Sequence, residues 1–353
     1  MKLLVTGAAG FIGSNFLHYF LDKYPNHAIV GLDNLTYAGN LTNLTDIPKE
    51  QSKRFKFYKG DINDIKLLKQ IFAKEDIYGV INFAAETHVD RSIEDPLVFL
   101  KTNVLGTQSL LKVCKDSWFI KNEWQENHRF LQISTDEVYG SLGPTGYFTE
   151  TTPINPHSPY SASKASADLL VKAYYDTYNM PVIITRCSNN YGPYQFPEKL
   201  IPLMINNVLL HKKLPIYGDG KQIRDWLYVT DHCNAIDLSF HKGKNGEVYN
   251  IGGHNERENI LVVKTIIDVL RRITKVEGIN EDLINYVEDR LGHDRRYGID
   301  PEKIMKELGW KPRIMFDEGL ERTINWYITN KKWLERIYTR EYIELNKKLA
   351  SKF

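Results

Sequence analysis

Two side chains that can move a proton stand one helical turn apart in this sequence, Tyr160 and Lys164. Residues at i and i+4 share a helix face. A lysine ammonium there favours the phenolate of a tyrosine whose unperturbed pKa is near ~10. Such a phenolate takes a proton from an alcohol as hydride leaves the same carbon. Tyr–Lys pairs are also common on surfaces, so this pair indicates chemistry only beside a nucleotide-binding array of strands and helices.

A second constellation is the run Thr135, Asp136 and Glu137, at the carboxyl end of an expected strand, Phe130–Thr135. Ligands of open α/β sheets bind outside those ends. Adjacent carboxylates are costly there unless they are solvated or serve a reaction. Elimination of water needs an acid for the leaving hydroxyl and a base for a carbon-bound proton. The pair suits these two roles, and a solvated Asp–Glu at the start of a loop is the plain alternative.

A glycine-rich turn opens the chain, with Gly7, Gly10 and Gly13 between an expected strand and an expected helix. Glycines permit a tight turn and close approach to a pyrophosphate, which the helix N-terminus attracts. Asp33 follows twenty residues after Gly13, at the end of the second expected strand. A carboxylate there binds ribose hydroxyls and repels a 2′-phosphate, which favours NAD over NADP. Asp61, after the third strand, is placed to meet the adenine edge.

The elements that must position these residues alternate strand with helix through the first half. Expected strands are Lys2–Thr6, Ala28–Asp33, Phe55–Gly60, Val80–Ala84, Phe130–Thr135 and Val182–Arg186; expected helices include Phe11–Tyr24, Asp64–Ala73, Pro96–Lys115 and Tyr160–Tyr178. This alternation predicts an α/β fold with a Rossmann-type doubly wound parallel sheet.

The second half is less regular, and we expect a smaller C-terminal α/β domain that binds substrate. The predicted boundaries are 1–186 for the NAD-binding domain and 187–353 for the substrate domain, with about 226–251 and 310–329 returning to the first. Helices are expected at Leu200–His211, Thr230–Phe240, Val262–Ile273, Pro301–Leu308 and Asp317–Thr329, and Asn189–Glu198 is expected to be irregular loop. The tail after Asn330 is charged and suits a helix.

Composition excludes several classes of protein. The chain has 353 residues and a net charge of +2, which gives no electrostatic reason to expect a nucleic acid or a membrane as partner. Its three cysteines are far apart, so neither a disulfide framework nor a metal site is expected. No apolar run reaches about 18 residues, and glycines interrupt the N-terminal apolar stretch. We therefore expect a cytoplasmic protein.

Taken together, the motifs resemble the extended short-chain dehydrogenase/reductase superfamily, and within it the dTDP-glucose 4,6-dehydratase family. Beyond the turn, Asp33 and Asp61, the similarity covers Ala84–Ser92, Thr102–Asn103, Thr135–Gly140, Tyr160–Lys164, Cys187–Pro193, Glu198–Pro202, Pro215–Gly220, Ile223–Val229 and Gly292–Tyr297. The Thr-Asp-Glu triplet and the late Gly-His-Asp-Arg-Arg-Tyr run are the most specific. Leu291 and Gly298 depart from the family's usual proline and alanine.

The resemblance implies three steps on bound NAD+: oxidation at C4, loss of water across C5–C6, and return of hydride to C6. It assigns the base at the 4-hydroxyl to Tyr160 with Lys164, a hydrogen bond to that hydroxyl to Thr135, the C5 base to Glu137 and the acid at the 6-hydroxyl to Asp136. Expected cofactor-binding residues are Gly7, Gly10, Phe11, Ile12, Gly13, Asp33, Asn34, Leu35, Thr36, Asp61, Ile62, Phe83, Ala84, Ala85, Thr87, Thr102, Tyr160, Lys164 and Asn190.

For the substrate, dTDP-glucose, the resemblance implies contacts from a second group of residues. They are Thr87, Thr135, Asn189, Lys199, Leu200, Pro215, Ile216, Tyr217, Arg224, Asn259, His293, Asp294, Arg295, Arg296 and Tyr297. It also implies a homodimer formed by the helices Pro96–Lys115 and Tyr160–Tyr178, with Leu169, Leu170, Ala173 and Tyr174 at the interface.

Three alternatives remain open. A nucleotide-sugar 4-epimerase shares the fold and the Tyr–Lys pair but carries small residues where Asp136 and Glu137 stand. A GDP-mannose 4,6-dehydratase uses NADP, which Asp33 opposes. A non-catalytic NAD-sensing protein on this fold loses the tyrosine or the lysine, whereas this chain keeps both.

Overall fold

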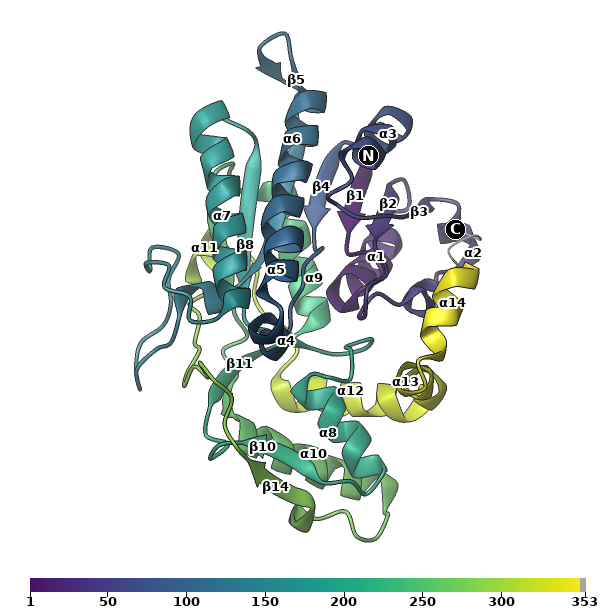
Figure 1. The fold of residues 1–353 in the computed structure, drawn as a ribbon, viewed down its shortest axis with the longest axis vertical. Helices are drawn as coiled ribbons and strands as arrows, with labels where there is room; N and C mark the ends of the chain where they lie inside the picture. Colours follow the sequence, from purple (N-terminus) through teal and green to yellow (C-terminus); the bar gives the residue numbers. More distant parts are fainter. Residues whose placement is uncertain (350–353) are drawn as a thin grey trace.

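The computed structural model describes residues 1–349, and its larger half is a seven-stranded parallel sheet with helices on both faces (Figure 1). In spatial order the strands are β12 (Val248–Ile251), β8 (Val182–Cys187), β7 (Arg129–Thr135), β4 (Gly79–Asn82), β1 (Lys2–Thr6), β2 (Ala28–Asp33) and β3 (Phe55–Lys59). The chain places β2 and β3 on one side of β1 and the later strands on the other. The order therefore reverses between β1 and β4, and the predicted Rossmann-type sheet is confirmed.

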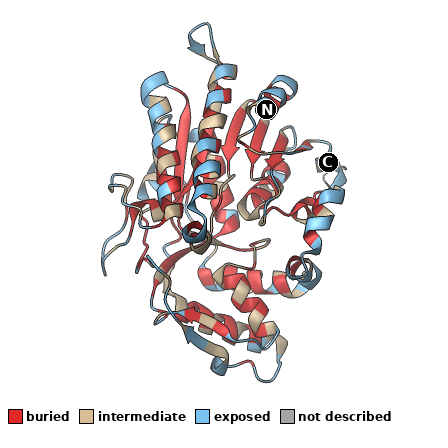
Figure 2. Cartoon of the chain, in the orientation of Figure 1, coloured by how far each residue is buried: buried red, intermediate tan, exposed pale blue. Residues whose placement is uncertain are grey.

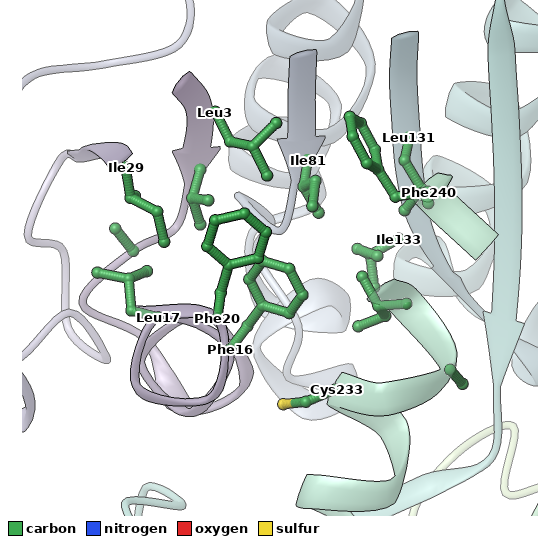
Figure 3. Close-up of a cluster of buried hydrophobic side chains, with 14 of the residues drawn as sticks. Leu3, Phe16, Leu17, Phe20, Ile29, Ile81, Leu131, Ile133, Cys233 and Phe240 are labelled. Atoms are coloured by element: carbon green, nitrogen blue, oxygen red, sulfur yellow. The ribbon is translucent and has the colours of Figure 1, made fainter. Parts of the chain in front are cut away.

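The strands of this sheet are mostly buried on both faces because both faces are covered, whereas the edge strand β3 alternates between buried and exposed residues. Along β1, Leu3 and Val5 pack into one core and Leu4 into another. The first core is shared with α1 (Phe11–Lys23), α9 (Val229–Lys242) and α11 (Glu302–Leu308) and appears in Figure 3. The second core is shared with α3 (Ile65–Glu75), α6 (Thr107–Trp118) and α7 (Pro159–Tyr178). Burial on both faces is typical of parallel sheets, and Figure 2 shows these strands almost wholly buried.

The remaining elements form a smaller half below the carboxyl ends of the strands in Figure 1. Its helices are α8 (Leu200–Leu209), α10 (Asn259–Thr274), α12 (Phe316–Thr329) and α13 (Lys331–Tyr338), which share one apolar core. Its strands are the parallel pair β10 (Leu214–Tyr217) and β14 (Ile284–Val287) and the three-stranded sheet β13 (Glu256–Glu258), β11 (Ile223–Tyr228) and β9 (Asn189–Tyr191).

The segments expected to return to the first domain are divided between the halves. In 226–251, β11 belongs to the small sheet, whereas α9 and β12 belong to the large one. In 310–329, Trp310 lies in the core beneath the large sheet, whereas Phe316 and Leu320 of α12 lie in the core of the smaller half. Because the chain crosses between the halves repeatedly, no single position in the sequence separates them. The domain boundaries given from the sequence stay a prediction.

One expectation about local structure is refined and another is wrong. The helix expected at Pro96–Lys115 is present as one continuous helical run to Trp118, in which α5 (Pro96–Phe99) and α6 are α-helical and η2 (Leu100–Gly106) between them is π-helical. A Cβ on Gly106 would meet Ile62 Cδ1 at 2.3 Å, so the turn lies tightly against the residues after β3. Asn189–Glu198 is not wholly irregular, because β9 pairs in parallel with β11. The Asn-rich composition of residues 189–198 does not predict a strand, and β9 forms because pairing with the distant β11 stabilises it.

The shorter elements connect these layers. They are η1 (Leu41–Leu44), α2 (Lys49–Ser52), α4 (Val89–Glu94), β5 (Phe119–Ile120), β6 (Glu123–Trp124), η3 (Asp136–Tyr139), η4 (Glu281–Leu283) and α14 (Glu341–Leu349). The three cysteines are free and buried. Within residues 1–349, no helix is long and apolar enough to cross a membrane, and no cluster of His, Cys, Asp or Glu side chains could hold a metal ion.

Candidate active site

The main cleft of the described chain opens at the carboxyl ends of β1, β2, β4 and β7. It holds about 1650 Å³ of empty space, part of it open to solvent. Its wall carries all the expected catalytic residues: Thr135, Asp136, Glu137, Tyr160 and Lys164. All the expected cofactor residues also border it, except Leu35. The cleft therefore brings together, at the point where the strand order reverses, most of the residues selected from the sequence.

The glycine turn can exist only with glycines at its narrowest points. Gly7 has φ +64°, and a Cβ on it would lie 2.8 Å from the nitrogen of Ala84. A Cβ on Gly13 would lie 2.1 Å from the carbonyl oxygen of Gly7. Helix α1 begins at Phe11 without a side-chain cap. Its free N–H groups and positive dipole end thus meet the cleft, a geometry that suits a pyrophosphate.

Asp33 closes the far end of this turn. Its carboxylate accepts hydrogen bonds from the backbone N–H of Ala9 at 2.9 Å and of Leu35 at 2.7 Å. Burial raises the pKa of Asp33, and these two amide donors oppose the rise. Asp61 accepts from the side chain of Asn34 at 3.3 Å, so the two expected adenosine-side carboxylates are joined through residue 34. These groups fit the ribose and adenine of a dinucleotide that lacks a 2′-phosphate.

The start of α7 fixes Tyr160 and Lys164. Ser158 and Ser161 form a reciprocal capping box, and Pro159 occupies the first helical position. Both functional side chains are buried, and Lys164 Nζ donates to the carbonyl oxygen of Ile133 in β7 at 2.6 Å. Helix and strand are thereby held together directly beneath the cleft.

The tyrosine is a weak acid in this environment. Burial raises the pKa of Tyr160 well above its ordinary value, the charge of Glu137 adds to the rise, and a hydrogen bond with Thr135 opposes it. Burial also lowers the pKa of Lys164, against the charge of Asp168. The ammonium of Lys164 keeps its positive charge when it donates to the neutral carbonyl oxygen of Ile133, so its expected role in favouring the phenolate stays a prediction.

Asp136 and Glu137 have different surroundings although they are neighbours. Burial, followed by the charges of Glu137 and Asp225, raises the pKa of Asp136 well above its ordinary value. Burial raises the pKa of Glu137 as well, but the positive charges of Arg290 and Arg224 oppose that rise. Asp136 is only 2% exposed, and its Oδ2 has no hydrogen-bond partner among the described residues. The environments therefore favour Asp136 as the acid and Glu137 as the base of the pair.

The expected substrate residues fall into two groups. Thr87, Thr135, Asn189 and Lys199 border the cleft, and Lys199 Nζ donates to the Thr87 carbonyl oxygen at 3.2 Å. The others lie outside its wall, in the smaller half: Leu200, Pro215, Ile216, Tyr217, Arg224, Asn259, His293, Asp294, Arg295, Arg296 and Tyr297.

Within this second group, the side chains face different ways. Arg224 donates to the Asp294 carbonyl oxygen at 3.0 Å and stacks on Tyr297, in reach of the charge of Glu137. Arg295 instead forms an exposed ion pair with Asp219 at 2.8 Å, and Ile216 is buried in the core of the smaller half. Arg224 and Tyr297 thus extend the site below the cleft, whereas Arg295 is held away from it.

The sequence reasoning missed several residues that border the cleft. Tyr37 donates to Glu198 Oε1 at 2.9 Å, and the guanidinium of Arg91 stacks 3.6 Å over the Tyr37 ring. Glu86 and Phe196 also line the wall. The sequence offered one signal for Glu198, because this residue stands next to Lys199, which was already expected to bind substrate.

Comparisons with known proteins agree with this geometry. A family model described as GDP-mannose 4,6 dehydratase matches residues 4–323. A dTDP-glucose 4,6-dehydratase of Xanthomonas campestris pv. campestris is 51% identical over 96% of each chain, and dTDP-glucose 4,6-dehydratase 1 of Escherichia coli is 49% identical over 97% of each. A dTDP-glucose 4,6-dehydratase of Bacillus anthracis, solved with NAD, superposes with a TM-score of 0.85 at 51% identity, covering 96% of this chain and 99% of its own.

A more distant solved structure shares the fold but carries the name of another activity. The UDP-glucose 4-epimerase of Thermotoga maritima is 28% identical, with a TM-score of 0.81 over 93% of this chain and 99% of its own. Fold and site together define a nucleotide-sugar-modifying enzyme on a Rossmann-type sheet. Because the three dehydratases match about half of its residues over nearly its whole length, this chain belongs to the dTDP-glucose 4,6-dehydratase family.

Proposed function

We propose that the protein converts dTDP-glucose into dTDP-4-dehydro-6-deoxyglucose with NAD as a cofactor that is regenerated in each cycle. The observation that carries the proposal is the pair Asp136–Glu137 at the end of β7, where Asp136 is buried, Glu137 is half-buried and both border the same cleft as Tyr160. An enzyme that only oxidises and reduces C4 has no use for a second acid and base. Loss of water across C5–C6 requires both.

The chain's own residues fit NAD at the expected place. The glycine turn and the uncapped start of α1 suit the pyrophosphate, and Asp33 suits the adenosine ribose. Tyr160, Lys164 and Asn190 border the opposite end of the same cleft. NAD bound there supplies a hydride acceptor for C4, a hydride donor for C6 and a positive charge on its oxidised ring.

Oxidation needs a base at the 4-hydroxyl of the sugar. Thr135 holds that hydroxyl, and Tyr160 removes its proton. Because burial raises the pKa of Tyr160, the phenolate needs positive charge nearby, which the oxidised ring of bound NAD and the ammonium of Lys164 would supply. The carbonyl oxygen of Ile133 holds that ammonium in position.

Elimination divides the work between the two carboxyl groups. Once C4 is a ketone, the C5 proton is acidic, and Glu137 removes it. Asp136 gives its proton to the departing 6-hydroxyl, which leaves as water. Burial raises the pKa of both carboxyl groups, and the charges of Arg290, Arg224 and Lys199 oppose the rise at Glu137, which suits Asp136 as the acid and Glu137 as the base. Arg224 and Lys199 would supply positive charge to the diphosphate of the substrate.

Incubation of the purified protein with dTDP-glucose and, separately, UDP-glucose tests the proposal. The expected result is a 4-keto product that absorbs in alkali, formed from dTDP-glucose. Interconversion of glucose and galactose nucleotides without loss of water would show an epimerase instead. The cofactor released on denaturation should be NAD, and release of NADP would contradict the role of Asp33.

We also propose a cytoplasmic homodimer. Apolar side chains stand exposed along the outer faces of η2 and α7, among them Leu100 and Leu105 on the first and Leu169 on the second. Leu97 of α5 continues this strip. Exposed apolar strips on two adjacent helical segments suit a four-helix contact between copies.

A further inference from the structure

The C-terminal helices α13 and α14 are anchored in the smaller half. Trp333, Leu334 and Ile337 of α13 are buried in its core with Tyr327 of α12. Trp333 also reaches out of that core, because its indole N–H donates to Asn43 Oδ1 in η1 at 2.8 Å. The tail that carried no chemical signal in the sequence is therefore joined to the segment that follows β2.

Helix α14 binds the backbone of that segment through two side chains. The carboxamide of Asn346 accepts from the N–H of Leu41 at 2.8 Å and donates to the carbonyl oxygen of Gly39 at 2.7 Å. Tyr342 donates its hydroxyl to the Tyr37 carbonyl oxygen at 2.8 Å. Asn346 and Tyr342 are nearly fully buried, and α14 lies against this segment in Figure 1. Three backbone groups of residues 37–41 thus take their partners from α14.

The same backbone forms the wall of the cleft beside Asp33. Residues 36–39 border the cleft, and a Cβ on Gly39 would lie 2.8 Å from Asp33 Oδ1. Leu35 takes φ +55°, a conformation that its own side chain disfavours. The segment belongs to no strand ladder. One turn bond, from the Gly39 N–H to the Thr36 carbonyl oxygen at 3.1 Å, lies within it, and the Asn40 N–H donates to the Ala9 carbonyl oxygen at 3.0 Å, so the contacts from α14 are among the few that hold its shape.

We propose that Asn346 and Tyr342 are positioning residues for the adenosine end of the cofactor, so that α14 sets how tightly NAD is retained. This inference rests on the proposed NAD site at Asp33. A segment that is already fixed loses less conformational freedom when a ligand binds, so affinity rises without any added contact. Because α14 is anchored through α13 in the core of the smaller half, the substrate half thereby contributes to the cofactor site without touching the cofactor.

The test uses the full-length protein freed of cofactor. The variants are Asn346→Ala, Asn346→Asp, which keeps the acceptor for Leu41 but loses the donor for Gly39, and Tyr342→Phe. Lys347→Ala, an exposed position on the same helix, is the control. Three quantities are measured: the dissociation constant for NAD, the dissociation constant for dTDP, and the hydrogen exchange of the amides of residues 37–41.

Asn346→Ala should weaken NAD roughly tenfold, and the other two variants roughly threefold, as expected for one or two lost hydrogen bonds. Exchange in residues 37–41 should accelerate, dTDP affinity should stay the same, and Lys347→Ala should behave as the unmodified protein. Equal weakening of NAD and dTDP, or unchanged NAD affinity in Tyr342→Phe and both Asn346 variants, overturns the inference. If the unmodified protein binds no NAD, the proposed function fails instead. Tyr342→Phe, which removes one hydroxyl, decides the matter if Asn346→Ala does not fold.

Discussion

At the scale of single residues, the site separates two carboxyl groups that the sequence places side by side. Asp136 is enclosed near another carboxylate, Asp225, and Arg224 opposes the rise of its pKa, whereas Arg290, Arg224 and Lys199 all oppose the rise at Glu137. The residue types and their order predicted an acid and a base. Which was which followed from resemblance alone, because Arg290, which acts on Glu137, stands about 150 positions later in the chain and only the fold brings it near.

Changing Asp136 to Asn separates oxidation from elimination. Tyr160 and the cofactor site remain, so substrate should still be oxidised and absorbance of reduced cofactor should rise on the enzyme. Loss of the acid should slow product formation by roughly 10²–10⁴-fold. Tyr160→Phe is the matched comparison, since it should give neither reduced cofactor nor product. Dehydration by Asp136→Asn at nearly the unmodified rate would remove this residue from its role.

The same substitution should stabilise the fold. Burial raises the folded-state pKa of Asp136, so its contribution to stability is complete below the unfolded pKa and is lost as pH rises through the folded pKa. Asp136→Asn avoids that loss. Its thermal midpoint should exceed that of the unmodified protein at about pH 8, with the difference shrinking toward about pH 4, the pKa of free aspartate. Asp22→Asn, on the exposed face of α1, should show no such trend.

At the scale of elements, six of the seven strands of the large sheet were predicted to within two residues at each end, because burial leaves apolar runs in the sequence. Strand β12 and the strands of the smaller half were not predicted. The π-helical turn η2 left no such trace. Pro96–Lys115 has helical periodicity throughout, although Thr102 of η2 borders the cleft and Gly106 at the end of η2 packs against Ile62. The short strand β9 was likewise missed, because its pairing with β11 joins residues far apart in sequence.

The capping box of α7 gives a prediction at this scale. Ser158 caps the helix that carries Tyr160 and Lys164, so Ser158→Ala should cost about 1 kcal/mol of stability and loosen both side chains. The oxidation step should slow more than substrate binding weakens, and a comparison of kcat with KM measures this. Ser166→Ala, farther along the same helix, bonds only to a carbonyl one turn back and should leave kcat unchanged.

At the scale of the whole molecule, the two halves are interleaved rather than consecutive. The chain enters the smaller half at β9, returns to the larger half for α9 and β12, leaves again, and returns once more for α11, and the described part ends on α14 in the smaller half. A linear sequence shows each element but not this threading, which divides the segment 310–329 between the cores of the two halves. The cleft lies between the halves, so binding of both ligands depends on their mutual placement.

Assembly gives the last prediction. Leu97 of α5 is 63% exposed, and Leu169 of the adjacent α7 is 58% exposed. Burial of these two side chains against a second copy of the chain would lower the free energy, because it removes apolar surface from water. A stable contact of this kind covers roughly 1,600 Å² in total, an area that two pairs of helical faces can supply. Leu169→Asp should therefore place a charge in the contact and shift the mass measured by light scattering at micromolar concentration from dimer to monomer. Leu210→Asp is the matched control, since Leu210 is 53% exposed at the end of α8, outside the strip, and should leave the mass unchanged. A monomeric mass for the unmodified protein, or a dimer that persists in Leu169→Asp, would place the contact elsewhere or remove it.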